Sequence, residues 1–276
     1  MEELDLFYSQ MSEASTLTKE KKFEEALNLY AKIFEEYLDT KEERIKEYLP
    51  YTLYNKALIY ANKKEYKKEL ELYNELLSKF ISNISSDSEL IFSKAYMNKA
   101  VCIQELKGER DSLEVYKEFL QNFKETKNKK ILEDIVQAKY NLAFLLGKEE
   151  KDKESIEAYE DLIATFKNFE EEYFLEFVAK ALVNKANKHK ELYEFDKAIE
   201  LFDEVIKSYQ QFVRQVAISY HNKAAILAEL QEEEKLKTIC DEIIEKFSNV
   251  HDEFIMNIVS SAEVLKDKDK FNKNCF

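Results

Sequence analysis

The sequence predicts an all-α fold of stacked amphipathic helices, and its composition is the first reason. The 276 residues include only two glycines and one proline, whereas folds rich in tight turns use both freely. Charged residues make up 36% and hydrophobic residues 45% of the chain, a balance typical of amphipathic helices. Neither Gly108 nor Gly147 has a second glycine near enough to form a phosphate-binding loop. Sheet-based, dinucleotide-binding and P-loop folds are therefore excluded.

A repeated tripeptide, asparagine followed by lysine or leucine and then alanine, sets the order of the helices. Its asparagines are spaced 43, 43, 43 and 38 residues apart, at Asn55, Asn98, Asn141, Asn184 and Asn222. An aromatic residue stands 25 residues after each, at Phe80, Phe123, Phe166, Tyr209 and Phe247. Another position, 18 residues after each asparagine, holds Tyr73, Tyr116, Tyr159, Phe202 and Cys240. These offsets follow a helical period, so each unit is expected to contain two helices: helix A with the asparagine, then helix B.

The repeat divides the chain, read as one domain over residues 1–276, into six helix pairs and a cap. The pairs are expected at about 1–40, 41–83, 84–126, 127–169, 170–212 and 213–249. Ser12 replaces the asparagine in the first pair. A single helix at about 250–266 closes the stack, and residues 267–276 are expected to fray. Pro50 lies five residues before Asn55, where a proline either starts a helix or kinks it, and we expect the kink.

These residues resemble the tetratricopeptide repeat, a pair of antiparallel helices with small residues where the helices cross and aromatic residues in the gaps. Ala57 and Ala143 match the small residue of helix A, and Tyr66 matches the aromatic residue that opens helix B. The small helix-B residue is matched by Ala26, Ser112, Ser155 and Ala198, and the large aromatic one by Tyr30, Tyr73, Tyr116, Tyr159 and Phe202. A family unit has about 34 residues, so this chain is a long-repeat variant of about 43. Glu69 and Leu236 break the small-residue rule.

The resemblance implies a right-handed superhelical solenoid in which the A helices line a concave groove with the asparagines on its inner wall. An asparagine side chain both accepts and donates hydrogen bonds, so five in a row can pair with the main chain of an extended peptide. Each bond contributes only about 0.5–1.5 kcal/mol, so apolar pockets are also needed. The residues one before and three after each asparagine share its helical face: Tyr54 and Leu58, Met97 and Val101, Tyr140 and Phe144, Val183 and Asn187, and His221 and Ala225.

Lysines are expected to make the middle of this groove mildly basic. Lys94 and Lys180 lie one turn before their asparagines, and Lys190 lies near the far end. A partner with acidic or carboxylate groups fits such a surface. The family's carboxylate clamp, however, needs a lysine just before an asparagine-bearing turn, and none of the five turns has one.

The leading functional hypothesis is therefore a non-enzymatic protein-interaction module that binds an extended peptide. Alanine at Asn98, Asn141 and Asn184 together is expected to weaken partner capture without changing the melting temperature. One alternative is that the asparagine amides only tie adjacent A helices together. Another is a regulatory sensor that closes around a small peptide or metabolite. His221 is the one histidine among the candidate groove residues, so any pH-dependent role of the groove would use it.

Several other functions are excluded or disfavoured. The net charge of −14 and the presence of only three arginines, at Arg44, Arg110 and Arg214, argue against nucleic acid. No stretch is apolar enough for a membrane span. Three scattered cysteines, Cys102, Cys240 and Cys275, indicate reduced thiols and hence a cytoplasmic protein. The three histidines share no ligand spacing, so no metal, cofactor or catalytic group is expected.

Overall fold

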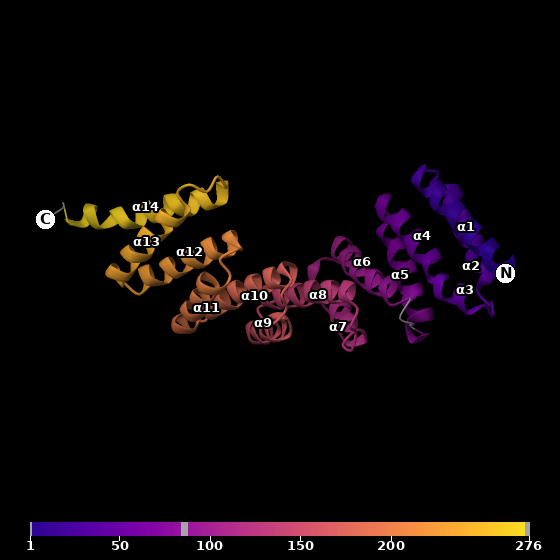
Figure 1. Cartoon of the computed structure of the whole chain (residues 1–276), viewed down its shortest axis with the longest axis horizontal. Coiled ribbons are helices and arrows are strands. Elements are labelled where there is room, and N and C mark those ends of the chain that lie inside the picture. The colour runs from indigo at the N-terminus through magenta and orange to yellow at the C-terminus, as the bar shows by residue number, and fades with distance from the viewer. Residues whose placement is uncertain (1, 84–87, 274–276) are drawn as a thin grey trace. The chain divides into compact units, whose positions relative to one another are not determined.

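A computed structural model describes residues 2–83 and 88–273, and no β-strand occurs in either range (Figure 1). The A helices are α1 (Glu2–Lys19), α4 (Pro50–Asn62), α6 (Glu89–Lys107), α8 (Lys129–Lys148), α10 (Glu172–Glu191) and α12 (Val213–Glu229). The B helices are α2 (Phe23–Tyr37), α5 (Tyr66–Phe80), α7 (Leu113–Asn122), α9 (Asp152–Phe166), α11 (Phe195–Ser208) and α13 (Glu233–Phe247). Three short helices, α3 (Glu43–Tyr48), η1 (Ile81–Asn83) and η2 (Glu109–Ser112), lie in the connections. The predicted all-α class is confirmed, with one A and one B helix inside each predicted pair.

The last helix, α14 (Glu253–Lys273), stands where the cap was predicted, but it is longer than expected. It continues past residue 266 through most of the segment that was expected to fray. The final residues 274–276, which include Cys275, lie outside the described residues. The loss of apolar residues along the sequence therefore does not mark the end of this helix.

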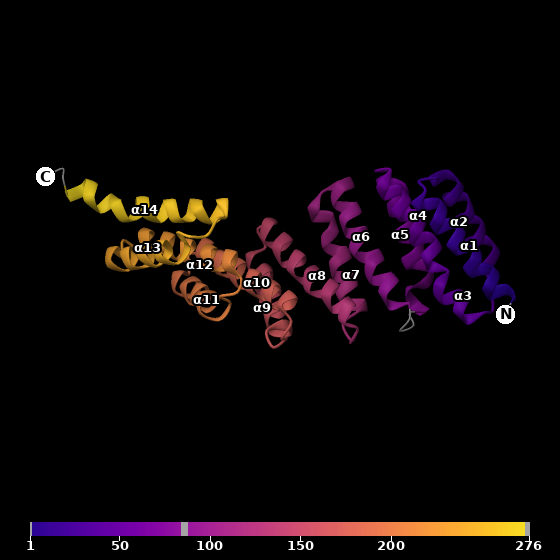
Figure 2. The same cartoon turned by 45° about the horizontal axis from the view of Figure 1, so that its top comes forward.

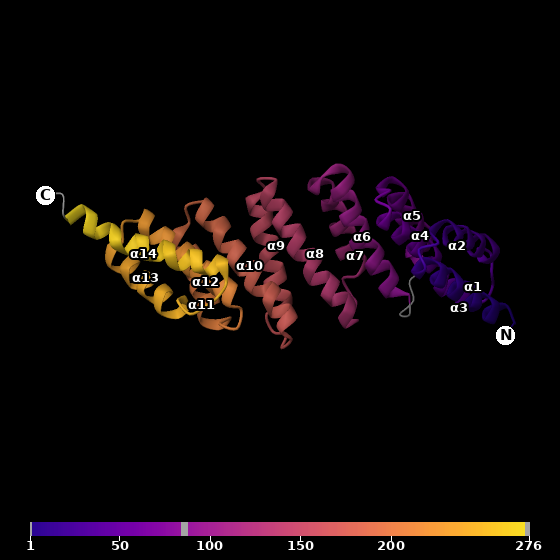
Figure 3. The same ribbon diagram turned by 90° about the horizontal axis from the view of Figure 1, so that it is seen from above.

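The chain divides into two compact units, Met1–Leu145 and Leu146–Phe276. Unit 1 holds α1 to α7 and most of α8; unit 2 holds the end of α8 and α9 to α14. In unit 1, α2, α4 and α6 follow one another and pack in that order (Figure 2). In unit 2, α10, α12 and α14 do the same (Figure 3). Because each repeat packs on its sequence neighbours, each unit has its own continuous core. The repeat pattern runs through residue 145 and does not mark this division.

Fixed repeat positions fill both cores. The alanine two residues after each asparagine is at most 1% exposed: Ala57, Ala100, Ala143, Ala186 and Ala224. The large helix-B aromatic residue is at most 2% exposed: Tyr30, Tyr73, Tyr116, Tyr159 and Phe202. The small side chain lets neighbouring helices approach closely, and the aromatic ring fills the space that remains. The repeat offsets thus correspond to a packing pattern.

The turns from helix A to helix B explain how the chain manages with so little glycine. Five of them use a non-glycine residue in the left-handed conformation, with φ between 57° and 61°: Lys21, Lys64, Glu150, Tyr193 and Gln231. Each stands nine residues after the repeat asparagine or Ser12. In the second pair, the Glu65 N–H then donates to the Tyr60 carbonyl at 2.9 Å, which closes a Schellman motif. Gly108, with φ 100°, makes the corresponding turn in the third pair.

Pro50 is the first residue of α4, so it starts a helical segment, which was the less expected of the two alternatives. Helix α3 ends at Tyr48 and α4 begins at Pro50, while Leu49 between them keeps helical angles of φ −58° and ψ −37°. Proline lacks the N–H that would continue the hydrogen-bond ladder. The result is one long helix A in two segments.

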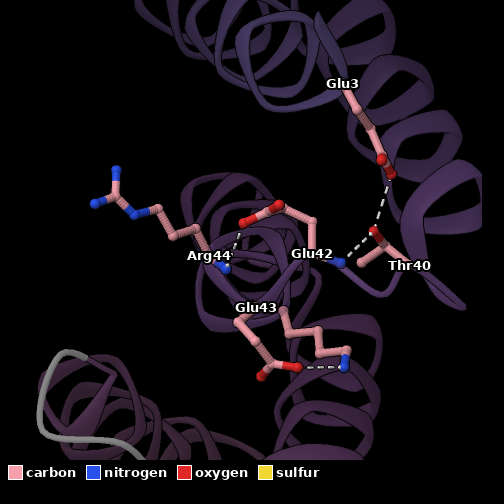
Figure 4. Close-up of polar contacts among 6 residues, drawn as sticks. Glu3, Thr40, Glu42, Glu43 and Arg44 are labelled. Carbon is pink, nitrogen blue, oxygen red and sulfur yellow. Dashed lines mark hydrogen bonds and ion pairs between the residues drawn. The ribbon is translucent and has the colours of Figure 1, made fainter. Parts of the chain in front are cut away.

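The connection into α3 is held by side-chain caps (Figure 4). The Glu42 carboxylate accepts from the Arg44 N–H at 3.5 Å. The Thr40 hydroxyl accepts from the Glu42 N–H at 3.2 Å and donates to Glu3 Oε1 at 2.9 Å. The loop after the first pair is therefore anchored to α1 as well as to α3.

Candidate binding face of the A helices

Four positions per A helix face away from the core of unit 1. Counted from the asparagine, they are −4, −1, 0 and +3, which share one side of a helix. In α4, α6 and α8 they are Tyr51, Tyr54, Asn55 and Leu58; Lys94, Met97, Asn98 and Val101; and Gln137, Tyr140, Asn141 and Phe144. None of these twelve residues is buried, whereas positions −3 and +2 are fully buried in all three helices. We call the twelve residues the A-face of unit 1.

Apolar and aromatic side chains are prominent on this face. Val101 is 53% exposed and Phe144 is 44% exposed. The Phe144 ring stacks on that of Tyr140, with centroids 6.5 Å apart and planes 8° apart. Tyr51 stacks on Tyr48 of α3 at 5.6 Å. The predicted apolar positions in unit 1 are thus accessible to a ligand.

The asparagine amides make hydrogen bonds inside the protein, and in two repeats the partner is the helix-B tyrosine of the preceding pair. Asn141 Nδ2 donates to the Tyr116 hydroxyl at 3.1 Å, and Asn184 Nδ2 donates to the Tyr159 hydroxyl at 3.2 Å. In both cases the two residues are 25 positions apart. These tyrosines, expected only to fill the core, also tie one helix pair to the next.

Two asparagines instead bridge neighbouring A helices, as the tie hypothesis supposed. Asn98 Nδ2 on α6 donates to the Tyr54 hydroxyl on α4 at 3.1 Å. Asn222 Nδ2 on α12 donates to Asn187 Oδ1 on α10 at 2.8 Å. Tyr54, predicted as a ligand pocket, thus already accepts one hydrogen bond. At least four of the five asparagines use an amide N–H to join helices.

Burial raises the pKa of the helix-B tyrosines further above physiological pH. Loss of contact with water raises the pKa of Tyr30 and of Tyr116, because the phenolate is disfavoured away from water. Thr18 and then Asn55 oppose part of this rise at Tyr30, and the hydrogen bond from Asn141 opposes part of it at Tyr116. The hydroxyls remain neutral hydrogen-bonding groups at physiological pH.

The lysines expected to make the groove basic are paired with carboxylates. Lys94 Nζ lies 2.7 Å from Asp134 Oδ1, and the Ser93 hydroxyl donates to Asp134 Oδ2 at 2.6 Å. In unit 2, Lys180 lies 2.7 Å from Glu176. The expectation of a basic middle was therefore wrong at both positions. It failed at Lys94 because Asp134, only 5% exposed, belongs to no repeat position. It failed at Lys180 because Glu176 lies one turn earlier on the same helix. The one signal of Asp134 in the sequence is a pair of acidic residues, Glu133 and Asp134, inside the otherwise apolar stretch 131–136.

The remaining predicted residues, Lys180, Asn184, His221 and Asn222, belong to unit 2. Asn222 borders a cavity of about 390 Å³ between α10 and α12, lined by Asn187, Lys190, Glu191, Tyr193, Asn222 and Glu229. His221 is half-buried beside Asn222. Burial, and then the charge of Lys190, lower the pKa of His221, which favours the neutral imidazole at pH 7.

A second cavity, of about 600 Å³, lies in unit 1 at the ends of the helices. Its lining residues are Leu38, Glu43, Lys46, Glu47, Pro50, Lys79, Phe80, Ser88 and Phe92. None of them belongs to the A-face, and Phe80 is the one member that the repeat pattern singled out. This cavity arises where the inter-repeat connections meet, which the helical pattern does not describe.

The described ranges contain no group of three or more histidine, cysteine, aspartate or glutamate side chains that could hold a metal. Within the same ranges, no helix has the length and apolar character needed to cross a membrane.

Comparisons with known proteins support the fold. No family model matches the chain, and no curated protein matches its sequence. The apo form of RapI superposes with a TM-score of 0.56 at 12% identity, covering 97% of this chain and 75% of that chain. BtubC (BKLC) from P. vanneervenii gives 0.55 at 16%, covering 83% and 93%. The TPR2AB domain of yeast Sti1 gives 0.38 at 19%, covering 94% and 99%. The likeness to the first two shows the fold alone: a tetratricopeptide-like helical repeat.

Proposed function

We propose that this protein is a non-enzymatic interaction module that binds an extended segment of a partner protein on the A-face of unit 1. One observation carries the proposal: repeat asparagines and accessible apolar side chains lie on the same side of three successive A helices, and on two of these helices an apolar side chain is about half exposed. Val101 and Phe144 are the most exposed apolar members. Such a surface offers both apolar contacts and hydrogen bonds to an extended chain.

The proposed hydrogen bonds to the partner are fewer than those of five asparagines that each donate and accept. Asn98 and Asn141 each donate from Nδ2 to a tyrosine hydroxyl, and this bond restrains the amide. Their Oδ1 atoms accept no hydrogen bond from any residue described in the structure. Each oxygen can therefore accept from a backbone N–H of the partner. The asparagines act as restrained acceptors.

Apolar contacts supply most of the affinity in this proposal. Fully burying a side chain such as Val or Phe stabilises by about 1.5–3 kcal/mol, and Val101 and Phe144 have about half of that area left to bury. One hydrogen bond contributes about 0.5–1.5 kcal/mol net. Because Lys94, the one lysine of the A-face, is paired with Asp134, the partner segment is expected to be apolar rather than acidic.

The test changes the exposed apolar residues and leaves the asparagines in place. The double variant Val101→Gln with Phe144→Gln is compared with a control, Met256→Gln with Val264→Gln, whose residues are 54% and 59% exposed on α14. Partners captured from native cells are identified by mass spectrometry, and peptides tiled across them are titrated by fluorescence anisotropy. We expect the A-face variant to bind at least about tenfold more weakly, the equivalent of 1.4 kcal/mol, while the control binds normally. Equal binding by both variants would show that the A-face does not bind the partner.

Alanine substitution of the asparagines is a poorer test than the sequence indicated. Asn98, Asn141 and Asn184 all donate to tyrosine hydroxyls. Removing the three amides breaks these ties, so the melting temperature is expected to fall. The expectation of unchanged melting is therefore corrected.

A further inference from the structure

The cavity at the ends of the unit 1 helices opens beside the one repeat aromatic residue that is not buried. The aromatic residue 25 positions after the asparagine is at most 8% exposed in the other four repeats: Phe123, Phe166, Tyr209 and Phe247. Phe80, its counterpart in the second pair, is partly exposed and lines the cavity. This junction therefore departs from the packing that the other repeats share.

The walls of the cavity are partly apolar. Phe92 of α6 and Pro50 of α4 are buried there, and Leu38, which follows α2, is 42% exposed. The volume of about 600 Å³ falls within the range of roughly 300–1,000 Å³ that is typical of small-molecule sites. Leu38 and Phe80 have apolar surface left for a ligand to bury.

Four charged side chains complete the lining, and three of them have a counter-ion within the protein. Lys46 Nζ lies 2.7 Å from Glu43 Oε1 (Figure 4), and Lys79 Nζ lies 3.8 Å from Glu75 Oε1. The fourth is Glu47, one turn after Glu43 on α3 and partly buried. Among residues 2–83 and 88–273, no side chain forms an ion pair or a hydrogen bond with its carboxylate. The cavity thus presents one negative charge that has no internal partner.

We infer that this cavity binds a small primary amine with an apolar body. The ammonium pairs with the Glu47 carboxylate, and the body lies against Leu38 and Phe80. Withdrawing a carboxylate from water is costly unless a cation or hydrogen-bond donor joins it, and a charge-assisted hydrogen bond from an ammonium supplies both. The net charge of −14 also favours the approach of a cation over that of an anion.

Two lysines of the lining oppose this binding to a limited extent. Lys46 and Lys79 repel a cation, although each is offset by its own carboxylate. Removing Lys46 also releases Glu43, which leaves two carboxylates facing the same side of α3. An amine is therefore expected to bind more tightly to Lys46→Gln, whereas an anionic ligand would bind more weakly. The inference uses no residue of the A-face, so it does not depend on the proposed function.

The experiment is isothermal titration calorimetry on the full chain with hexylamine, phenethylamine and tryptamine as probes. Phenylpropionate reverses the charge, phenylethanol removes it, and ethylamine keeps the charge but lacks the apolar body. We expect saturable binding of at least one of the three probes, weakened by added salt, and binding at least about tenfold weaker for each of the other compounds. No saturable binding of any probe, or equally tight binding of phenylpropionate, would overturn the inference.

Three variants assign the binding to this cavity. Glu47→Gln is expected to weaken amine binding at least about tenfold, as loss of a charge-assisted bond would, and Lys46→Gln is expected to strengthen it. Glu71→Gln, at an exposed position on α5 that does not line the cavity, removes the same charge and is expected to bind normally. Equal affinities of Glu47→Gln and Glu71→Gln, or weaker binding to Lys46→Gln, would show that the amine does not bind here.

Discussion

The A helices of the two units present different surfaces from the same repeat positions. In unit 1, the positions flanking Asn98 and Asn141 hold large apolar residues such as Val101 and Phe144, both exposed. In unit 2, the corresponding positions hold small, polar or buried residues: Val183, Asn187, His221 and Ala225. The repeat register thus determines which side chains face outward, while residues outside it determine what that surface can bind.

Charge makes the same distinction. Lys94 of unit 1 is neutralised by Asp134, a buried carboxylate with no equivalent in the other repeats. Lys190 of unit 2 lines a cavity together with Asn187 and Asn222, whose amides are hydrogen-bonded to each other. The charge of the A-helix surface therefore differs between the two units.

The largest expected effect comes from removing Asp134. The variant Asp134→Ala leaves the fully buried Ser93 hydroxyl without its acceptor and is expected to cost about 1–3 kcal/mol of unfolding free energy. In unit 2, Glu176→Ala removes the partly exposed partner of Lys180 and is expected to change stability by less than about 1 kcal/mol. Urea unfolding of both variants measures the difference. Similar losses would mean that the Asp134 cluster is no more stabilising than a surface ion pair.

The next largest loss of stability is expected from removing the hydrogen bond between Tyr116 and Asn141. Tyr116→Phe and Asn141→Ala are each expected to destabilise the protein by about 1 kcal/mol. Because both remove the same hydrogen bond, the double variant should lose less than the sum of the two. The matched cycle in unit 2 uses Asn187→Ala and Asn222→Ala, which share the bond of 2.8 Å. Strict additivity in either cycle would show that the bond contributes nothing to stability.

A smaller gain is expected at the left-handed turns. Lys64→Gly in unit 1 removes the strain of a side chain at φ 57° and is expected to stabilise by about 0.5–1 kcal/mol. Tyr193→Gly in unit 2 should gain less, because it also loses the ring contact with Phe195 at 5.9 Å. Glu71→Gly, at an exposed position inside α5, is the control, expected to destabilise by about 1 kcal/mol. Thermal melts compare the three, and a loss at Lys64→Gly would contradict the strain argument.

The smallest expected effect is a pH slope from Glu69 of unit 1. This residue takes the small helix-B position and is buried, and its burial raises the pKa above the usual 4.5. The folded state therefore holds the proton after the unfolded state has released it. The stabilisation that protonation of Glu69 contributes is fully present below about pH 4.5 and is lost as the pH rises through the pKa of the folded state.

Glu69→Gln cannot ionise, so between pH 4.5 and 7 its unfolding midpoint should fall less than that of the unmodified protein. Ala198 holds this position in unit 2, so no such slope arises there. Identical slopes for variant and parent would show that Glu69 is already ionised in the folded state.

The sequence predicted the helices well because a helical core leaves a periodic trace. Alanines such as Ala57 and tyrosines such as Tyr116 recur at fixed intervals, and each proved to be buried. Functional residues were harder to predict. Asp134 lies outside every repeat position, and the pairing of Lys94 with it joins residues 40 positions apart. Asn98 bonds to Tyr54 although Tyr73 stands at the helix-B position before it, and the repeat pattern does not indicate which partner an asparagine meets.

By itself, the sequence determined that this chain forms paired amphipathic helices, where the pairs begin and end, and which side of each A helix carries the asparagines. These properties follow from local periodicity, because burial repeats with the turn of the helix. Only the tertiary structure decided that the asparagines bond to tyrosines, that Lys94 is neutralised and that a cavity opens beside Asn222. Those outcomes depend on side chains from different helices meeting in space, and spacing along a single helix does not specify such meetings.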